Sequence, residues 1–454
     1  MTNDRAAVHS REREPQPPQA RGLDRRAFLR WAGAACAGAV GSSALAACGG
    51  SSAASGATAS ANRVVLASVP SYANAYFTMW RQGGQEAAQA LGLQYVMQSY
   101  EGSATEQLAQ LQAAKAAGAA QVTAFPIDNG DTAQMAKTLA SQGIYLATAF
   151  DAQPWEVPSD PAYKGYYSVN FLMSEVEGMR KLSLAVFRQI GNSGKVIYIQ
   201  GAPTDLTSVL RERGFDEAVQ MTPGIQVVAK QYGYEAEATT APVIGALLSQ
   251  HPDVAAVVCH NSSEALAVDA ALAQRGMSHV KVGSSDEEVD ILDQMINGPN
   301  QVVVRAIFGV WTGGYMVVRN FDAANGVPIT PVERLLNGDS LVLDTKESAQ
   351  LFKQIIFERS TSGYDWRKMS RHLHPNDWDA QTGMAPLDPN VLFTQYLGKP
   401  RPAGYQYPPE LEKQLQEGAI AHYTSLYAQH VRSSPVAPAI RATTSGETVL
   451  GFKV

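Results

Sequence analysis

The sequence predicts an α/β protein built from two doubly wound parallel-sheet lobes. Short apolar runs alternate with amphipathic helical patterns from about residue 63 onward, which is typical of a parallel sheet with helices on both faces. The alternation occurs in two successive series of four or five units, so two sheets are expected. A chain of 454 residues is also long enough for two or three structural units.

The first series ends near residue 150. Its expected strands are 64–69, 93–98, 122–125 and 144–150, and its expected helices are 76–91, 104–117 and 132–142. The second of these helices shows the signals that predict it: Ser103 can cap its start, Glu106 follows three residues later, and Gly118 can end it.

The second series continues to about residue 308. Its expected strands are 195–200, 225–234, 254–261, 280–286 and 302–308, and its expected helices are 174–189, 207–221, 236–249, 263–274 and 287–296. In doubly wound sheets, ligands bind beyond the carboxyl ends of the strands. Functional residues are therefore expected in the loops where these strands end.

The N-terminus carries a targeting pattern. Arg25 and Arg26 stand directly before an Ala- and Gly-rich apolar stretch that ends in Leu-Ala-Ala-Cys48. This resembles a twin-arginine export signal joined to a lipoprotein signal, which implies removal of 1–47, a lipid on Cys48, and a membrane-anchored product in the periplasm or at the cell surface. A retained membrane span is the alternative, but residues 31–47 are short and small for one. Residues 48–61 are expected to be a flexible tether.

Charge and cysteine content exclude several classes of protein. The formal net charge is −6, and because 1–47 carry seven Arg against two Asp and two Glu, the exported product has a net charge of −9. Nucleic acid is therefore not an expected partner. Cys36 leaves with the signal and Cys48 is expected to carry lipid. Cys259 then remains, in an apolar run that favours an inert buried thiol.

Polar and aromatic residues gather in a specific order along the two series. The segments are Ser68 with Asn74-Ala75-Tyr76-Phe77, Phe125-Pro126-Ile127-Asp128, Arg211-Glu212-Arg213-Gly214-Phe215, His251-Pro252-Asp253-Val254-Ala255-Ala256-Val257 before Asn261, and Gly283-Ser284-Ser285-Asp286. Together they resemble the ribose-binding group of type I periplasmic sugar-binding proteins, over residues 63–357.

This resemblance implies a monomeric binding protein whose lobes, joined by three crossovers, close on a small sugar or polyol and deliver it to an ABC permease. It places 62–169 and 309–332 in the first lobe, and 170–308 and 333–357 in the second. The implied ligand contacts are Asn74, Tyr76, Phe77, Phe125, Asp151, Arg211, Tyr234, Asn261, Asp286 and Phe308. Asp, Asn and Arg can each engage two hydroxyls, and aromatic rings cover the C–H faces of a sugar.

Several of these residues have a simpler structural interpretation. Arg211 could be a solvated helix residue, Asn261 could cap the next helix, and Tyr76 and Phe77 could belong to the core. Tyr232 competes with Tyr234 for its position. Where ribose binders commonly have Asn and Asp-Arg, this chain has Phe125 and Phe150-Asp151, and the Gln expected near the last crossover is replaced by Ile307, Phe308 or Gly309. A more aromatic pocket is therefore expected, for a ligand less hydroxylated than ribose or of another shape.

The resemblance ends near residue 357. A strand at 341–343 and a helix at 346–357 are expected to complete the second lobe. Residues 358–454 are rich in Pro and aromatic residues, with a helix expected over 409–427, and are predicted to pack on the lobes. His372 and His374 could chelate a metal with Asp377 or Asp379, but a surface or packing role is favoured because no well-spaced third ligand follows.

No enzyme signature is found. The sequence contains no G-x-S-x-G, Walker, H-E-x-x-H or G-x-G-x-x-G motif, so a non-enzyme without cofactor or metal is expected. Two alternatives to import remain. One is a ligand sensor of the same fold that signals to a membrane receptor, as the autoinducer-2 receptor does. The other is an exported enzyme with an unrecognised site.

Overall fold

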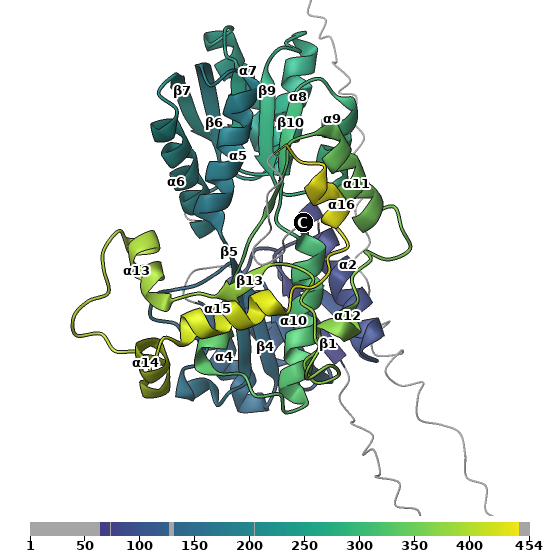
Figure 1. Cartoon of the computed structure of the whole chain (residues 1–454), viewed down its shortest axis with the longest axis vertical. Helices are drawn as coiled ribbons and strands as arrows, with labels where there is room; N and C mark the ends of the chain where they lie inside the picture. Colours follow the sequence, from purple (N-terminus) through teal and green to yellow (C-terminus); the bar gives the residue numbers. More distant parts are fainter. Residues whose placement is uncertain (1–63, 73, 127–130, 204, 445–454) are drawn as a thin grey trace, which may run out of the picture. The chain divides into compact units, whose positions relative to one another are not determined.

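The computed structural model describes residues 64–444, except 73, 127–130 and 204, and Figure 1 colours them along the chain. They all belong to one compact unit, Ser60–Val454. The predicted signal segment 1–47, Cys48 and the tether 48–61 lie outside the described residues, and so does Asp128.

The first lobe is built on a sheet of seven strands within the described residues. Five of the six pairs of neighbouring strands run parallel, and only the edge strand β13 is antiparallel to its neighbour β11. In spatial order the strands are β13 (Met384–Pro386), β11 (Leu335–Gly338), β5 (Tyr167–Met173), β4 (Tyr145–Ala149), β3 (Ala119–Ala124), β1 (Val64–Val69) and β2 (Gln94–Ser99).

Helices α2 (Ala75–Ala90), α3 (Ala104–Gln112), α4 (Asp131–Gln142) and α10 (Gly309–Ala324) pack around this sheet (Figure 1). Helices α2 and α10 cross with their backbones almost touching, because glycines face each other there. A Cβ on Gly83 would lie 1.7 Å from the carbonyl oxygen of Val310, and a Cβ on Gly313 would lie 2.3 Å from that of Trp80.

The second lobe has a six-stranded sheet within the described residues. Its strands are β12 (Leu341–Leu343), β10 (Gln301–Ala306), β9 (Lys281–Ser285), β8 (Ala256–Cys259), β6 (Gly194–Gln200) and β7 (Ile225–Tyr232), in that spatial order. Only β12 is antiparallel. The helices of this lobe are α5 (Glu175–Gln189), α6 (Leu206–Met221), α7 (Glu237–Gln250), α8 (Ser262–Gln274), α9 (Val289–Asn297) and α11 (Lys346–Ile356).

The two-lobed part of the chain passes between the two sheets three times, after β5, after β10 and after β11, and the extension then returns to the first sheet as β13. The predicted fold class is therefore confirmed: two doubly wound lobes, three crossovers and a C-terminal extension. The predicted lobe boundaries at 170 and 333 are corrected. Strand β5 continues to Met173 and pairs in parallel with β11, so 170–173 and 335–338 belong to the first sheet.

Strand β5 was missed because polar residues interrupt its apolar pattern. Ser168 and Asn170 are buried in it, and both are satisfied: Ser168 donates to the backbone oxygen of Leu146, and Asn170 donates to that of Asp151 at 2.6 Å. The helix expected over 104–117 is also shorter, since α3 ends at Gln112 and a turn leads to Gly118, whose φ is +81°.

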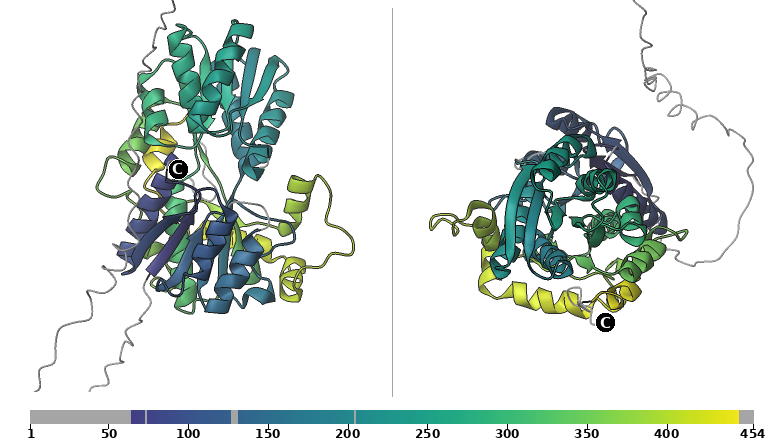
Figure 2. Two further views of the ribbon diagram at one scale, coloured as in Figure 1. Left: turned by 180° about the vertical axis from the view of Figure 1, so that it is seen from behind. Right: turned by 90° about the horizontal axis from the view of Figure 1, so that it is seen from above.

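The C-terminal extension packs on both lobes. It contributes β13 to the first sheet, and its helix α15 (Ala419–Gln429) lies against β13, as Figures 1 and 2 show. Helix α16 (Ala437–Arg441) contacts α11 of the second lobe, and Thr345 donates to the backbone oxygen of Ala442 at 2.7 Å. The remaining helices of the extension are α12 (Trp366–Met369), α13 (Pro389–Leu397) and α14 (Pro409–Gln416).

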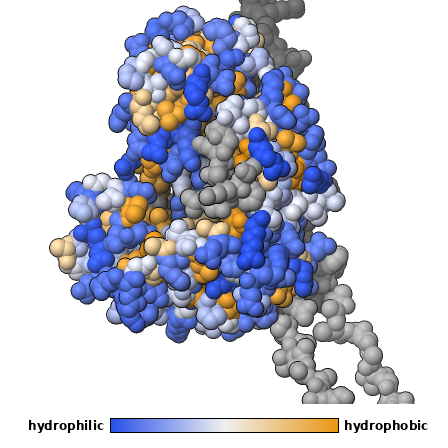
Figure 3. Space-filling model, viewed as in Figure 1, coloured by the Kyte–Doolittle hydropathy of each residue, from blue (hydrophilic) through white to orange (hydrophobic). Residues whose placement is uncertain are grey.

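The face shown in Figure 3 is largely hydrophilic, with apolar residues scattered between polar ones. The large apolar side chains are mostly buried, in clusters on either side of each sheet. Within the described residues, no helix has both the length and the apolar character that crossing a membrane requires.

Candidate functional site

A cavity of about 310 Å³ lies where strands of both sheets end. Tyr100, Phe125 and Phe150 directly follow β2, β3 and β4, while His260 and Asp286 directly follow β8 and β9. The carboxyl ends of the strands are the edge at which doubly wound sheets bind ligands. The lining residues are Pro70, Asn74, Tyr76, Phe77, Tyr100, Phe125, Pro126, Phe150, Asp151, Ala202, Asp205, Leu206, Thr207, Arg211, Glu235, His260, Asn261, Asp286 and Ile307.

The first lobe contributes an aromatic side to the cavity. Tyr76 and Phe77 stand in the first turn of α2, whose N-cap Asn74 accepts a hydrogen bond from the backbone of Tyr76 at 2.9 Å. Phe77 meets Phe125 edge-on with ring centroids 5.3 Å apart, and Tyr76 meets Phe150 edge-on at 5.6 Å. Such edge contacts hold the rings in fixed orientations. Both Tyr76 and Phe77 are buried, so they serve the core and line the cavity.

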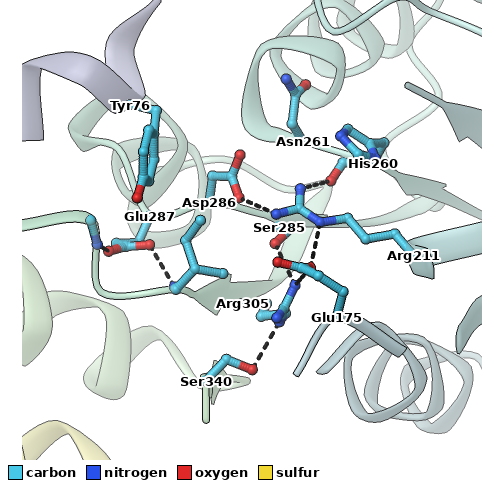
Figure 4. Close-up of polar contacts among 12 residues, drawn as sticks. Tyr76, Glu175, Arg211, His260, Asn261, Ser285, Asp286, Glu287, Arg305 and Ser340 are labelled. Carbon is cyan, nitrogen blue, oxygen red and sulfur yellow. Dashed lines mark hydrogen bonds and ion pairs between the residues drawn. The ribbon is translucent and has the colours of Figure 1, made fainter. Parts of the chain in front are cut away.

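The second lobe contributes a network of buried ion pairs centred on Arg211 of α6 (Figure 4). Its guanidinium donates to Glu175 at 2.8 Å, to Asp286 at 3.1 Å and to the backbone oxygen of His260 at 2.7 Å. Glu175 also accepts from Arg305 at 2.6 Å. Burial acts to raise the pKa of Glu175, but the two guanidinium groups outweigh it and lower the pKa to about 2. Arg211 is therefore buried and paired.

Three further carboxyl groups line the cavity without an arginine partner among the described residues. Burial raises the pKa of Asp151 to about 7, against a hydrogen bond from Thr132 that acts to lower it. Burial and the nearby charge of Glu235 raise the pKa of Asp205 to about 6. Glu235 accepts a hydrogen bond from the backbone of Ala202 at 3.0 Å. Asp205 and Glu235 therefore give the second-lobe side of the cavity an acidic character, while Asp151 places a carboxyl group beside the aromatic residues of the first lobe.

Residues with a left-handed backbone gather at this edge of the sheets. Phe150, Glu235 and Asp286 have φ values of +69°, +63° and +76°, and all three line the cavity. Non-glycine residues rarely adopt this conformation, and it tends to occur at binding and catalytic sites. Here it turns the chain sharply at the strand ends, so that these side chains face the cavity.

The structure brings most of the predicted contact residues together. Asn74, Tyr76, Phe77, Phe125, Asp151, Arg211, Asn261 and Asp286 all line the cavity. Asn261 is at the same time the N-cap of α8, since its side chain accepts from the backbone of Glu264 at 3.0 Å. Arg211 is only 2% exposed, so it is not a solvated helix residue.

Tyr234 and Phe308 do not line the cavity, which corrects their predicted placement. Strand β7 ends at Tyr232, and the left-handed turn that follows leaves Tyr234 54% exposed, beside the ring of Tyr232. Phe308 is the N-cap of α10 and is buried against Phe352, with ring centroids 6.4 Å apart. Its neighbour Ile307 lines the cavity instead.

Several lining residues were not predicted. Phe150, Glu235 and His260 are immediate neighbours of predicted residues, and their side chains face the cavity because of local turns that the sequence pattern does not reveal. Asp205 is the N-cap of α6 and accepts a hydrogen bond from the backbone of Ser208. An Asp in a loop directly before a predicted helix is a capping signal, and this signal could have identified Asp205 from the sequence.

The histidines of the extension do not converge on a metal. His372 packs edge-on against Phe321, while His374 contacts Asp377 at 3.2 Å. Among the described residues, the group with three possible metal ligands close together is Asp205, Glu235 and His260, in the cavity.

Residues 65–325 match the family model described as "Periplasmic binding protein domain". The D-apiose import binding protein of Paraburkholderia graminis is 22% identical over 247 residues, which cover 54% of this chain and 77% of that protein. The ribose import binding protein of Escherichia coli is 28% identical over 236 residues, which cover 52% of this chain and 76% of that protein.

A similar fold occurs in the solved structure of a twin-arginine translocation pathway signal protein from Burkholderia phytofirmans. The TM-score is 0.60 at 22% identity, over 64% of this chain and 91% of that one. The family model spans more than half of the chain and agrees with the two-lobed fold and its cavity. The chain therefore belongs to the periplasmic binding protein domain family.

Proposed function

We propose that this chain is an exported, lipid-anchored binding protein that captures a small sugar or polyol between its lobes and delivers it to an ABC importer. The observation that carries the proposal is the cavity, which is lined by aromatic rings of the first lobe and by carboxyl and amide groups of both lobes. The relatives described as import binding proteins for D-apiose and ribose support a sugar as the solute and import as the role.

The chemistry of the cavity suits a polyhydroxylated solute. Each carboxylate accepts hydrogen bonds from up to two hydroxyl groups, while the rings of Phe77, Phe125 and Phe150 offer an apolar surface to C–H groups. A volume of about 310 Å³ is at the small end of the range for small-molecule sites. A monosaccharide or cyclic polyol is the matching size class.

The reactive side chains of the described residues are consistent with a protein that binds a solute without converting it. The thiol of Cys259 is buried, and burial raises its pKa well above the usual value, so it is not a nucleophile. The buried Arg211 and Arg305 are paired with carboxylates rather than with a base and a nucleophile.

Export by the twin-arginine route and lipidation of Cys48 are part of this proposal. The motif around Arg25 and Arg26 supports the route, and the Leu-Ala-Ala-Cys48 sequence supports the anchor. Changing Cys48 to Ser is expected to release the protein from the membrane fraction, because a Ser-, Gly- and Ala-rich tether has no lipid affinity of its own. Unchanged fractionation of that variant would contradict the anchor and leave solute capture untouched.

Solute capture can be tested directly. Mass spectrometry of small molecules that co-purify with the protein would identify the natural solute, and calorimetric titration with D-apiose, D-ribose, D-allose and myo-inositol would rank related candidates. We expect one molecule bound per chain, together with a more compact solution scattering profile, because a solute that contacts both lobes stabilises their closed arrangement. A failure of every sugar and polyol to bind, or chemical turnover of a bound one, would refute the proposal.

A further inference from the structure

We propose that Asp205, Glu235 and His260 form a binding site for one divalent transition-metal ion on the second-lobe side of the cavity. Each residue offers one ligand atom, and these atoms lie within 4.8 Å of one another. All three residues line the cavity, at the ends of β6, β7 and β8. Figure 4 shows His260 above Arg211, on the strand-end side of the second sheet.

His260 is the residue that distinguishes this group from a chance cluster of acids. Its side chain is 3% exposed, and its Nδ1 is buried without a hydrogen-bond partner among the described residues. A buried polar atom without a partner is energetically unfavourable. The backbone of His260 is fully engaged, since its nitrogen donates to Ile199 and Glu264 and its oxygen accepts from Arg211. The backbone of His260 is therefore fixed, and a ligand atom of its ring lies within 4.8 Å of those of the two carboxylates.

The surrounding backbone brings Glu235 to the imidazole. Tyr234 and Glu235 are consecutive residues with φ of +56° and +63°, and this turn is held by two hydrogen bonds: Glu235 donates to Glu264 at 3.0 Å and accepts from Asn261 at 3.2 Å. Gly201 leaves room for the approach. A Cβ there would lie 2.9 Å from His260 Cδ2 and 3.0 Å from Glu235 Oε1.

Backbone N–H groups orient both carboxylates. Asp205 Oδ2 accepts from Ser208 at 2.8 Å, and Glu235 Oε1 accepts from Ala202 at 3.0 Å. Ligand side chains in metal sites are typically oriented by hydrogen bonds of this kind from neighbouring groups. Arg211 does not neutralise this pair, because its guanidinium is already bonded to Glu175 and Asp286. A dication would balance the two negative charges.

The donor set indicates the class of metal. One imidazole with two carboxylates suits Zn²⁺, Mn²⁺, Fe²⁺ or Co²⁺, whereas Mg²⁺ and Ca²⁺ prefer oxygen ligands alone. Ligands at about 2.1 Å from a tetrahedral ion are about 3.4 Å apart. A small rotation of the partly exposed side chains of Asp205 and Glu235 would bring the donors to that spacing.

Three protein ligands leave at least one coordination position open toward the cavity. Adjacent hydroxyl groups of a captured solute could fill it, which would make the metal a specificity element. That last step rests on the proposed function, whereas metal binding itself does not.

The test is a titration of metal-free full-length protein with Co²⁺, followed by visible absorption, and with Zn²⁺, followed by calorimetry, both without any solute. We expect one ion per chain. A variant with Asp205→Asn and Glu235→Gln should bind at least about 100-fold more weakly. His260→Gln should also weaken binding and alter the Co²⁺ spectrum, because the imidazole ligand is lost. Circular dichroism of each variant would verify that it folds.

The matched control is a variant with His374→Gln and Asp377→Asn, which removes an exposed histidine and carboxylate pair from the extension. It should retain the affinity of the unmodified protein within about twofold. Absence of binding, or binding that the cavity variants leave unchanged, would overturn the site. Because the titration contains no solute, its failure would not affect the proposal of solute capture, which is measured separately.

Discussion

Arg211 illustrates how one buried side chain can serve both the fold and the proposed site. It is bonded to Glu175, Asp286 and the backbone of His260, so it fixes the positions of an acid and a histidine that line the cavity. Arg211 also lines the cavity, and two of the five N–H groups of its guanidinium are not used in these three bonds. Arg211 is thus both a positioning residue and a candidate contact.

Arg211→Ala is expected to weaken binding of the co-purifying solute by about ten- to a hundredfold, since a hydrogen bond to a charged group contributes about 1.5–3 kcal/mol. Calorimetric titration measures the loss. Arg213→Ala on the same helix is the control, because Arg213 is half-exposed, pairs with Glu217 and does not line the cavity. Equal affinities for the two variants would remove Arg211 from the site.

The burial of Asp269 on α8 predicts that the free energy of unfolding depends on pH. Its side chain is 7% exposed, and both of its carboxylate oxygens are buried without hydrogen-bond partners among the described residues. Burial raises its pKa from 3.8 to about 7. Because the folded state holds this proton more tightly than the unfolded state, the contribution of Asp269 to the free energy of unfolding falls as pH rises from about 4 to about 7.

Asp269→Asn should therefore gain stability relative to the unmodified protein between pH 4 and pH 8, by up to about 4 kcal/mol. Chemical denaturation at several pH values measures this difference. Asp290→Asn, at an exposed position of α9, should show no such gain. A constant difference between the Asp269 variant and the unmodified protein across this pH range would contradict the prediction.

At the scale of elements, two features shape the first lobe and the cavity. One is the set of residues with left-handed backbone at the strand ends, and the other is the close contact of α2 with α10. Glu287, next to Asp286, accepts from the backbone of Ile307 at 2.7 Å and of Gly309 at 2.8 Å (Figure 4). This joins the end of β9 to the start of α10, which in turn packs on α2. The aromatic residues of α2 are thus supported by the same crossover that borders the cavity.

The crossing of α2 and α10 depends on glycine. Gly83→Ala should lower the free energy of unfolding by about 3 kcal/mol, because its Cβ would collide with the backbone of Val310, which no rotamer change can relieve. Gly245→Ala on α7 is the matched control: its Cβ would meet nothing closer than 3.6 Å, so a gain of about 0.5–1 kcal/mol is expected. Denaturant unfolding compares the two, and similar effects would contradict the close crossing.

At the scale of the whole molecule, the extension is part of the folded structure. The Trp311 indole of α10 donates to the backbone oxygen of Ala380 at 2.8 Å, and Trp366 covers Gly314 and donates to Glu86 at 3.1 Å. The extension thus buries a side of α10 that the two-lobed part would otherwise expose.

Trp366→Ala should destabilise the protein by about 3–5 kcal/mol, the usual cost of removing a large buried aromatic side chain. Trp366 is 3% exposed, whereas Trp155 is 47% exposed, so Trp155→Ala should change stability by no more than about 0.5 kcal/mol. Thermal or denaturant unfolding followed by circular dichroism gives both values. A small effect at Trp366 would contradict the expectation that its packing on α10 stabilises the fold.

The sequence by itself determined the two-lobed α/β class, most strand and helix positions, and eight of the residues that line the cavity. Apolar periodicity and capping residues are local signals, and α3 begins where Ser103 predicts. The resemblance to sugar-binding proteins rested on several short segments that occur in a particular order along the chain.

Only the tertiary structure decided the other features. Strand β5 carries buried polar residues whose partners, such as Leu146, are distant in sequence. Whether Tyr234 or Glu235 faces the cavity depends on a left-handed turn that distant hydrogen bonds hold in place. The convergence of Asp205, Glu235 and His260 likewise requires three separate strands to end side by side. These features arise from long-range packing and hydrogen bonding, which local sequence patterns do not record.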